Sequence, residues 1–225
     1  MRCPVVLHVM TQKGRGYAPA QKNPRLFHGV GKFDAETGEV PEKAANSFSD
    51  AFGATMCALA EKDSRICAIT AAMPGGTGLL EFKKQFPKRM FDVGIAEEHA
   101  MSMAGGLAKA GMVPVVALYS TFLQRSYDMI LQDICLQKLH VVLAVDRAGL
   151  VGEDGETHHG VFDVGFLRQA PGMTILCPAD ISELKAMIYW ATMDCNGPVA
   201  VRYPRGADGT YTENLWDPEK PVAVY

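Results

Sequence analysis

The stretch RMFDVGIAEEHAMSMAGGLAKAGMVPVVALY, residues 89–119, decides the fold class. It opens with a short apolar strand at 89–94 and continues as a helix of small residues at 96–111. It closes with a nearly continuous apolar strand at 113–119. Strands that are buried on both faces of a sheet read as solid runs of Val, Ile and Leu rather than as alternating patterns. The stretch therefore predicts a strand–helix–strand unit whose two strands run parallel.

The same alternation continues on both sides of this unit. Further strands are expected at 66–70, 140–146, 173–178 and 198–204, and helices at 47–63, 79–86, 121–138, 162–169 and 181–194. Ser47 and Asp50 stand three residues apart and predict a capping box at the start of the first of these helices. The series indicates an α/β fold, a doubly wound and mostly parallel sheet with helices on both faces. In such sheets ligands bind at the carboxyl ends of the strands.

The two ends of the chain have a different character. Residues 4–10, PVVLHVM, read as a strand, and a polar segment rich in Gly, Pro and Lys follows it. A structureless connection of that length is unusual inside a compact domain. We expect three parts: an arm at 1–45 that belongs to a preceding domain, a main domain at 46–210, and a linker at 211–225 toward a further domain. The chain reads as a piece of a larger enzyme.

Composition excludes several classes of protein. The chain has 225 residues with a net charge of −3, 48% hydrophobic and 21% charged residues, which is typical of a globular protein. Lys and Arg are scattered and outnumbered by Asp and Glu, so no nucleic-acid partner is expected. No apolar run approaches the roughly 20 residues needed to span a membrane. The six cysteines form no CxxC pair, and we expect reduced, buried thiols in a cytoplasmic protein.

Ionisable and aromatic residues cluster where the predicted strands end. Glu97 follows the strand at 89–94, Tyr119 and Phe122 follow 113–119, and Arg147 follows 140–146, with Asp154 in the loop beyond. Arg205 follows the last strand. Because the carboxyl ends of parallel strands share one edge of the sheet, this edge is expected to gather them all.

Four motifs extend this pattern into a resemblance. The segments DVGIAEEHA, YSTFLQRSYDMI, DRAGLVGEDGETHHG and VRYPRG occur here in the order in which they occur in 1-deoxy-D-xylulose-5-phosphate synthases. The chain resembles these thiamine-diphosphate enzymes of the transketolase superfamily over essentially its whole length. The resemblance implies a transferase that joins pyruvate and glyceraldehyde 3-phosphate with loss of CO2, in the supply of isoprenoid, thiamine and pyridoxal precursors.

The same resemblance gives the three parts of the chain a meaning. Family members have a pyrophosphate-binding, a pyrimidine-binding and a C-terminal domain; residues 46–210 are similar to the middle one, and 1–45 to the end of the first. The family holds its diphosphate and Mg²⁺ with a GDG motif in the first domain. The only near match here, EDG at 153–155, belongs to a different motif. No metal ligand is therefore assigned, and the chain by itself is expected to be inactive or very weak.

For the cofactor, the resemblance implies a catalytic glutamate at Glu97. Its carboxylate would hydrogen-bond the aminopyrimidine ring, which requires a fixed position shielded from water. We expect Glu97 to be buried because its partner is a ligand ring rather than a protein group. Phe122 is expected to stack on that ring, and Ile95 and Arg125 to line the same pocket. His28 matches a family histidine that handles proton transfer.

For the substrates, the resemblance implies a set of cations and polar groups. Arg147 and Arg205 can each offer a planar pair of donors to a phosphate. Tyr119, Asp154 and His158 match polar positions around the substrates, and His158 is also assigned a catalytic role. Lys13, in the segment that carries His28, resembles a family lysine.

Several of these residues also have ordinary structural explanations. Glu97 could simply favour a helix start, Phe122 could be core, and either arginine could form a surface ion pair. His99 is expected to be a packed histidine with a satisfied hydrogen bond, and His159 a structural one. A zinc site at residues 97–99 fails because adjacent helical residues diverge by roughly 100°.

Three functions remain open from the sequence: the pyrimidine domain of a carboligating synthase, a non-catalytic interaction module, and a subunit of a split transketolase. A homodimer is expected, and the apolar helix face at 101–110 could lie in its interface, although such faces are more often intramolecular core.

Overall fold

A computed structural model describes residues 3–41 and 47–208, without the side chain of Glu153. The chain divides into two compact units, Met1–Ala44 and Ala45–Tyr225. The predicted linker at 211–225 lies outside the described residues.

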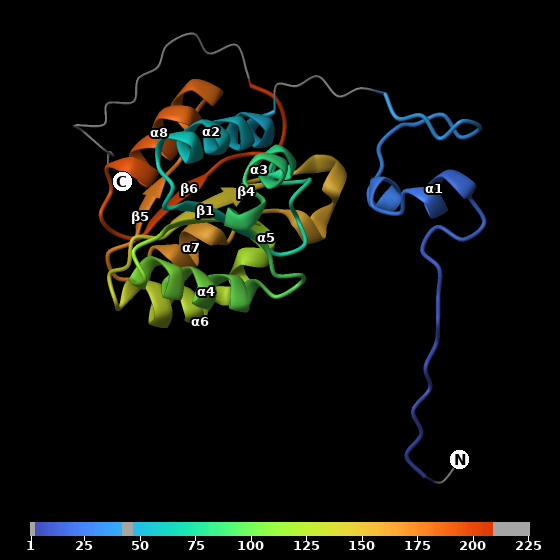
Figure 1. The fold of residues 1–225 in the computed structure, drawn as a ribbon, viewed down its shortest axis with the longest axis horizontal. Coiled ribbons are helices and arrows are strands. Elements are labelled where there is room, and N and C mark those ends of the chain that lie inside the picture. The colour runs from blue at the N-terminus through green and yellow to red at the C-terminus, as the bar shows by residue number, and fades with distance from the viewer. Residues whose placement is uncertain (1–2, 42–46, 209–225) are drawn as a thin grey trace. The chain divides into compact units, whose positions relative to one another are not determined.

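The second unit is built on a six-stranded sheet in which every pairing is parallel, in the order β2-β1-β3-β4-β6-β5 (Figure 1). The strands are β1 Ile66–Thr70, β2 Met90–Asp92, β3 Val113–Tyr119, β4 Val142–Asp146, β5 Thr174–Leu176 and β6 Val199–Arg202. The predicted α/β fold with a parallel sheet is confirmed. Strands β1 and β3 have the predicted bounds, and the other four are shorter than predicted.

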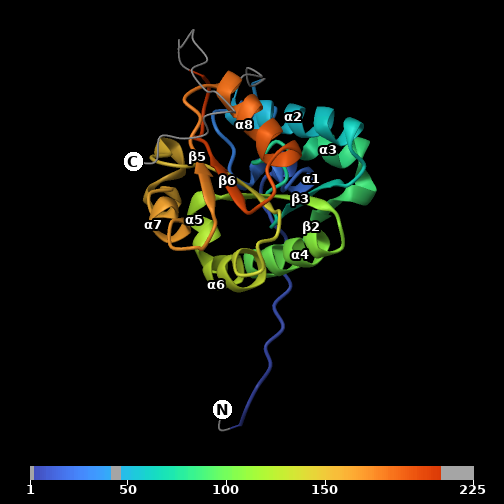
Figure 2. The same ribbon diagram turned by 90° about the vertical axis from the view of Figure 1, so that its left-hand side faces the viewer.

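Helices cover both faces of this sheet. One face carries α2 Phe48–Lys62, α3 Leu80–Gln85 and α8 Ile181–Met193, and the other carries α4 Glu97–Lys109, α5 Ser120–Leu123, α6 Tyr127–Met129 and α7 Asp163–Leu167 (Figures 1 and 2). Val115 in β3 belongs to the core under the first group, and its neighbour Val116 to the core under the second. Successive side chains of a strand point to opposite faces, which is why one apolar run serves two cores.

Helix α2 begins as its sequence predicts. The Ser47 hydroxyl accepts a hydrogen bond from the Asp50 backbone N–H, and the Asp50 side chain accepts one from the Ser47 N–H. This capping box satisfies two backbone donors that a helix start otherwise leaves without partners.

The single helix predicted at 121–138 is wrong in detail. The segment runs through α5, the 3₁₀ turn η3 Gln124–Ser126, α6 and the π-helix η4 Ile130–Cys135. The Ser126 hydroxyl donates to the Leu123 carbonyl at 2.8 Å, and such a bond competes with regular helix pairing. Regular apolar spacing does not reveal these changes of helix type, because they depend on local hydrogen bonds.

The strand ends meet where the sequence places its polar residues. Tyr119, the last residue of β3, is paired with Asp146, the last residue of β4, and Val145 is paired with Arg202 at the end of β6. Loops after these three strands therefore start side by side. Three short 3₁₀ turns complete this unit: η2 Pro87–Arg89, η5 Gly152–Asp154 and η6 Glu156–His158.

The first unit contains α1 Ala18–Lys22 and the 3₁₀ turn η1 Leu26–His28, with a small aromatic cluster of Tyr17, Phe27 and Phe33. The strand predicted at 4–10 is absent from the described part of this unit: these residues form no ladder, and Val6 is 96% exposed. A strand is stable only when it is paired with a neighbour. Apolar composition alone therefore overpredicted it.

Two further expectations concern the whole chain. Among the described helices, none combines the length and the apolar character that crossing a bilayer requires. The cysteines are free thiols; Cys57, Cys67 and Cys135 are buried as expected, whereas Cys3 and Cys177 are exposed.

Candidate active site

Eight of the predicted site residues form one connected set at the carboxyl ends of β3, β4 and β6 and the start of α4. They are Glu97, Tyr119, Phe122, Arg125, Arg147, Asp154, His158 and Arg205. Each touches at least one other member of the set. The sheet edge thus gathers the residues that the strand pattern placed there.

Glu97 is the first residue of α4, and its side chain is only 3% exposed. Arg125 Nη1 donates a hydrogen bond to Glu97 Oε1 at 2.8 Å, while the arginine side chain remains 45% exposed. The expectation that Glu97 has no protein partner is therefore wrong, because it pairs with Arg125, and its contact with a ligand ring stays a prediction. The positive end of the α4 dipole also favours a carboxylate at this position.

Aromatic rings connect this ion pair to the rest of the site. The Arg125 guanidinium lies 4.8 Å from the centroid of the Phe122 ring. Phe122 stacks on Tyr119 with centroids 5.9 Å apart and planes inclined by 18°, and the His158 ring meets Phe122 edge-on at 5.4 Å. The side chains of Tyr119, Phe122 and His158 thus form one aromatic group. They come from the end of β3, from α5 and from the loop after β4.

Arg147 directly follows β4 and has a φ of 58°, which is uncommon for a residue with a side chain. Its Nη1 contacts three protein acceptors: Asp146 Oδ1 at 3.0 Å, Ser49 Oγ at 3.2 Å and the Gly76 carbonyl at 2.5 Å. The guanidinium also lies 4.1 Å from the Tyr119 ring centroid. Its side chain is 12% exposed, so the default interpretation of a surface ion pair does not describe it.

Asp146 is a residue that sequence reasoning missed. It is fully buried, accepts from the Ser49 hydroxyl at 2.7 Å and from the Arg147 backbone N–H at 2.7 Å. Burial raises the pKa of Asp146 to about 6, although Arg147 and Ser49 act in the opposite direction. The signal was present in the sequence: an aspartate that ends a solid apolar strand must be buried with a partner, and an arginine follows it.

Burial acts on the neighbouring groups as well. It raises the pKa of Tyr119, against the effect of the Arg147 cation. For Arg147, burial alone would lower the pKa, but Asp146 and Tyr119 outweigh it and the pKa is raised. Arg147 therefore stays charged, and the cluster keeps its ionic character.

The turn after β1 is shaped by this cluster. A Cβ atom at Gly76 would overlap the Tyr119 hydroxyl, so only glycine allows the turn to approach the ring this closely. The same close approach brings the Gly76 carbonyl within hydrogen-bond distance of Arg147 Nη1. The turn at residues 75–78 is thus part of the site.

Asp154 lies between two arginines. Its Oδ1 is 3.1 Å from Arg205 Nη1, and its Oδ2 is 3.9 Å from Arg147 Nε. Asp154 Oδ2 and Arg147 Nε are both buried and have no hydrogen-bond partner. Buried polar atoms in this state are uncommon and mark a place that a ligand or water can complete.

Other predicted residues stand apart from this set. The Ile95 side chain is 80% exposed. His28 lies in the first unit, where its Nδ1 is 2.7 Å from Lys13 Nζ. The roles assigned to Ile95, His28 and Lys13 remain predictions.

His99 differs from its expectation. It is exposed rather than packed, because α4 buries the stripe formed by Glu97, Ala100, Met101, Ala104 and Gly105. Met101 and Ala104 belong to the core of this unit, so the apolar face of the helix is intramolecular.

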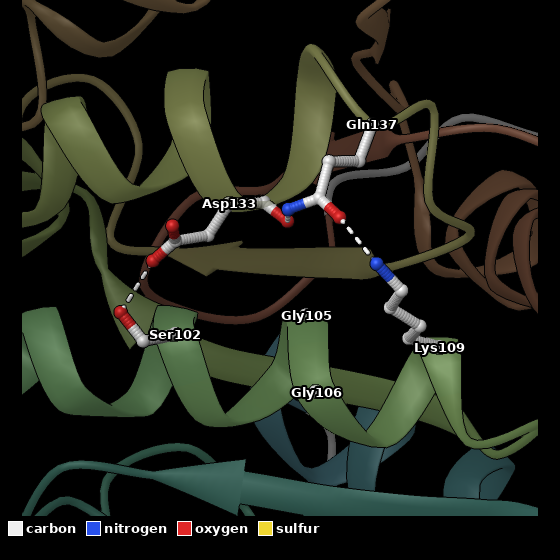
Figure 3. Close-up of a pocket in the computed structure, with 6 residues that line it drawn as sticks. All are labelled: Ser102, Gly105, Gly106, Lys109, Asp133 and Gln137. Carbon is white, nitrogen blue, oxygen red and sulfur yellow. Dashed lines mark hydrogen bonds between the residues drawn. The ribbon is translucent and has the colours of Figure 1, made fainter.

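A separate pocket of about 350 Å³ lies between α4 and η4 (Figure 3). Its lining residues are Ser102, Gly105, Gly106, Lys109, Asp133 and Gln137. Ser102 donates to Asp133, and Lys109 donates to Gln137 at 3.2 Å, so the polar side chains pair with one another. None of the predicted site residues lines it, and it suggests no ligand. Among the described residues, no group of three or more His, Cys, Asp or Glu side chains is arranged to hold a metal ion.

Comparison with known proteins places this geometry in context. Residues 44–208 match the family described as the transketolase pyrimidine binding domain. The chain is 60% identical over 203 residues to a 1-deoxy-D-xylulose-5-phosphate synthase of Desulforudis audaxviator, covering 90% of this chain and 32% of that protein. It is 55% identical over 214 residues to one of Clostridium kluyveri, covering 95% and 34%. The chain spans about a third of the length of these curated relatives.

Solved structures give a consistent result. A split gene transketolase, described as an inactive beta4 tetramer, matches with a TM-score of 0.64 and 28% identity, over 80% of this chain and 57% of that one. A transketolase from Campylobacter jejuni matches with a TM-score of 0.67 and 18% identity, over 79% and 29%, and shows the shared fold alone.

Proposed function

The chain belongs to the transketolase pyrimidine-binding domain family, and from this we propose that it is the pyrimidine-binding part of a 1-deoxy-D-xylulose-5-phosphate synthase. The complete enzyme would join pyruvate to glyceraldehyde 3-phosphate with release of CO2, using thiamine diphosphate. The observation that carries this proposal is the connected set of eight side chains around buried Glu97.

The residues present fit the aminopyrimidine end of thiamine diphosphate. A flat group bearing N–H donors, the Arg125 guanidinium, already hydrogen-bonds Glu97 and lies over the Phe122 ring. This contact supports the proposal that the carboxylate and the ring suit a planar donor. We assign Glu97 and Phe122 to the pyrimidine, with Ile95 at its margin and Arg125 holding the carboxylate in place. When bound, the cofactor supplies the carbon nucleophile that attacks the keto group of pyruvate.

Glu97 then holds a proton at a ring nitrogen of the pyrimidine. A carboxylate suits this task when its orientation is fixed and water is excluded. Arg125 supplies the orientation through a charge-assisted hydrogen bond, and the burial of Glu97 at the start of α4 excludes water.

We assign to His158 the transfer of a proton near the substrate. Its Nδ1 lies 2.9 Å from the Thr157 hydroxyl, which leaves Nε2 for a substrate oxygen. His28 would serve a second proton transfer from the arm, which we propose belongs to the preceding domain.

Arg205 and the Nε edge of Arg147 are the groups we assign to the phosphate of glyceraldehyde 3-phosphate. Nη1 of Arg147 is already engaged by protein acceptors, whereas its Nε has no hydrogen-bond partner. Tyr119 and Asp154 complete the polar wall around the sugar. A domain outside these 225 residues would supply the site for the diphosphate and Mg²⁺, and two copies of the enzyme would form a homodimer in the cytoplasm.

The proposal is tested in a chimera in which these 225 residues replace the matching third of the Desulforudis audaxviator enzyme. We expect the chimera to form 1-deoxy-D-xylulose 5-phosphate from its two substrates. Glu97→Gln should lower kcat by about 100-fold or more, as expected for loss of a proton-transfer group. Glu98→Gln, which changes the exposed neighbour, is the matched control and should leave the rate unchanged. A folded but inactive chimera, or normal turnover with Glu97→Gln, would contradict the proposal.

One observation favours a second candidate, a subunit of a split transketolase. The split gene transketolase covers 80% of this chain at 28% identity. A chimera that transfers a two-carbon unit between sugar phosphates but does not consume pyruvate would support this alternative.

A further inference from the structure

The loop that carries Asp154 and His158 is closed at its base by two glycines. Gly149 and Gly160 exchange two backbone hydrogen bonds of 2.7 and 2.8 Å, so residues 150–159 leave and return at the same point. A Cβ atom at Gly160 would overlap the Arg147 carbonyl and the Ser120 side chain, which is why the base can close so tightly.

Within this loop, the side chain of His159 bonds the backbone near the other end. The Val151 N–H donates a hydrogen bond to His159 Nδ1 at 3.1 Å. Val151 is only 5% exposed, so its N–H needs a partner inside the protein. The bond thus joins the two ends of the loop, at residues 151 and 159, through a side chain.

The direction of this hydrogen bond determines which nitrogen of the His159 ring carries a proton. A backbone N–H can only donate, and therefore Nδ1 of His159 must be the acceptor with a free lone pair. A neutral imidazole has one donor and one acceptor nitrogen, so its proton lies on Nε2. The doubly protonated ring would have no acceptor for Val151.

Other contacts also restrain the loop: Asp154 pairs with Arg205 at 3.1 Å, and the His158 ring meets Phe122 edge-on at 5.4 Å. The Thr121 hydroxyl donates to the Thr157 carbonyl at 3.0 Å, and Arg205 Nη1 reaches the Val151 carbonyl at 3.5 Å. Gly152 and Gly155 both have positive φ values, and glycines lose more backbone freedom than other residues when they become ordered. A bond that spans the loop therefore reduces this backbone freedom and helps to hold Asp154 and His158.

We propose that His159 is a positioning residue: a neutral imidazole whose Nδ1 accepts from Val151 and holds Asp154 and His158 in their places at the site. This inference rests on the proposed function for the roles of those two residues. The bond itself belongs to the folded chain and can be measured without any activity.

The first test uses this chain with two matched variants. His159→Phe keeps a ring of similar shape but removes the acceptor, and His159→Asn keeps an acceptor oxygen at the position of Nδ1 but removes the ring. Loss of the bond should speed hydrogen exchange of the Val151 amide by about 10-fold, with β3 amides as the internal reference. His159→Asn should restore most of the protection. Equal exchange in all three proteins, or fast exchange with Asn as well as with Phe, would overturn the proposal.

A second measurement needs no variant and decides the matter if His159→Phe does not fold. Nitrogen-15 NMR of the unsubstituted chain should show a His159 ring with its proton on Nε2 and a coupling across the bond to Val151. A proton on Nδ1 would refute the assignment.

The functional consequence is measured in the chimera. His159→Phe should raise KM for glyceraldehyde 3-phosphate more than it lowers kcat, and His159→Asn should recover KM. An unchanged KM with Phe would contradict the positioning role even if the bond exists. An inactive parent chimera would instead contradict the proposed function. The hydrogen exchange of the Val151 amide would still test the His159 bond independently of activity.

Discussion

Two ion pairs at the edge of the sheet have the same components and different construction. In the pair Glu97–Arg125 the carboxylate is 3% exposed, but the arginine is 45% exposed and bonds the carboxylate once, at 2.8 Å. In the pair Asp146–Arg147 the side chains are 0% and 12% exposed, and Ser49 and Gly76 add further bonds. Between them lie the stacked rings of Tyr119 and Phe122.

The difference indicates a division of labour. Arg125 is partly solvated by water, and the positive end of the α4 dipole also stabilises Glu97, so this carboxylate does not depend on the cation alone. A fully buried pair cannot separate without leaving an uncompensated charge inside the protein. The first pair is therefore suited to orient the Glu97 carboxylate toward a ligand, and the second to hold the loops that surround the ligand.

The largest effect on stability is expected from Arg147→Met, which removes the cation of the second pair but keeps a side chain of apolar bulk. Asp146 would remain buried without its counter-charge, and we expect the free energy of unfolding to fall by about 3–5 kcal/mol. Urea denaturation of this chain at pH 8 measures it. A loss as small as that of a surface ion pair would refute the claim that the second pair is structural.

The next largest effect is a pH dependence of stability that comes from Asp146. Its pKa is raised to about 6 in the folded protein, so the folded state binds this proton more tightly than the unfolded chain does. The contribution of Asp146 to stability should therefore increase as pH falls from about 7 to about 4, by up to about 3 kcal/mol.

Asp146→Asn tests this directly, because it removes the titrating group. The difference in unfolding free energy between the unsubstituted chain and this variant should change across that pH window and be level outside it. A constant difference would contradict the raised pKa.

A smaller effect is expected at Asp154, which stands between Arg147 and Arg205. Its negative charge would repel a phosphate from these two cations. Asp154→Asn should strengthen binding of inorganic phosphate to this chain by about 10-fold, equivalent to about 1.4 kcal/mol. Isothermal calorimetry at low salt measures it. Unchanged phosphate binding would mean that the two arginines do not form the anion site.

The smallest effect concerns the first pair. Arg125→Met should lower the free energy of unfolding by about 1 kcal/mol, because buried Glu97 loses one hydrogen bond but keeps the stabilising effect of the α4 dipole. Arg147→Met, measured in the same urea titration, is the comparison. A loss for Arg125→Met as large as that for Arg147→Met would show that both pairs are structural.

Much of the fold could be predicted because buried residues are apolar, and their spacing along the chain can be read from the sequence. The apolar run at 113–119 became β3, and the Ser47–Asp50 spacing became a capping box. Residues 4–10 show the limit of this reasoning: apolar composition permits a strand, but only a paired neighbour makes one. The changes of helix type in the segment 120–135 were not predicted for a similar reason. The hydrogen bond of the Ser126 hydroxyl does not alter the spacing of apolar residues along the chain.

The candidate site was predictable as a location and less so as a set of contacts. Strand ends indicated where Glu97, Phe122, Arg147 and Asp154 would gather. The partner of Glu97 was not predictable, because Arg125 lies 28 residues away and reaches it only through the packing of α4 against the segment after β3.

By itself, the sequence determined the alternation of strands and helices, the parallel sheet, and the edge at which polar residues collect. These follow from hydrophobic periodicity, which is a property of neighbouring residues. Only the tertiary structure decided which polar groups pair, as Ser49 with Asp146 across 97 positions, and which histidine supports the loop. Such pairings depend on how distant segments cross in space, and a few tenths of an ångström decide whether a hydrogen bond exists.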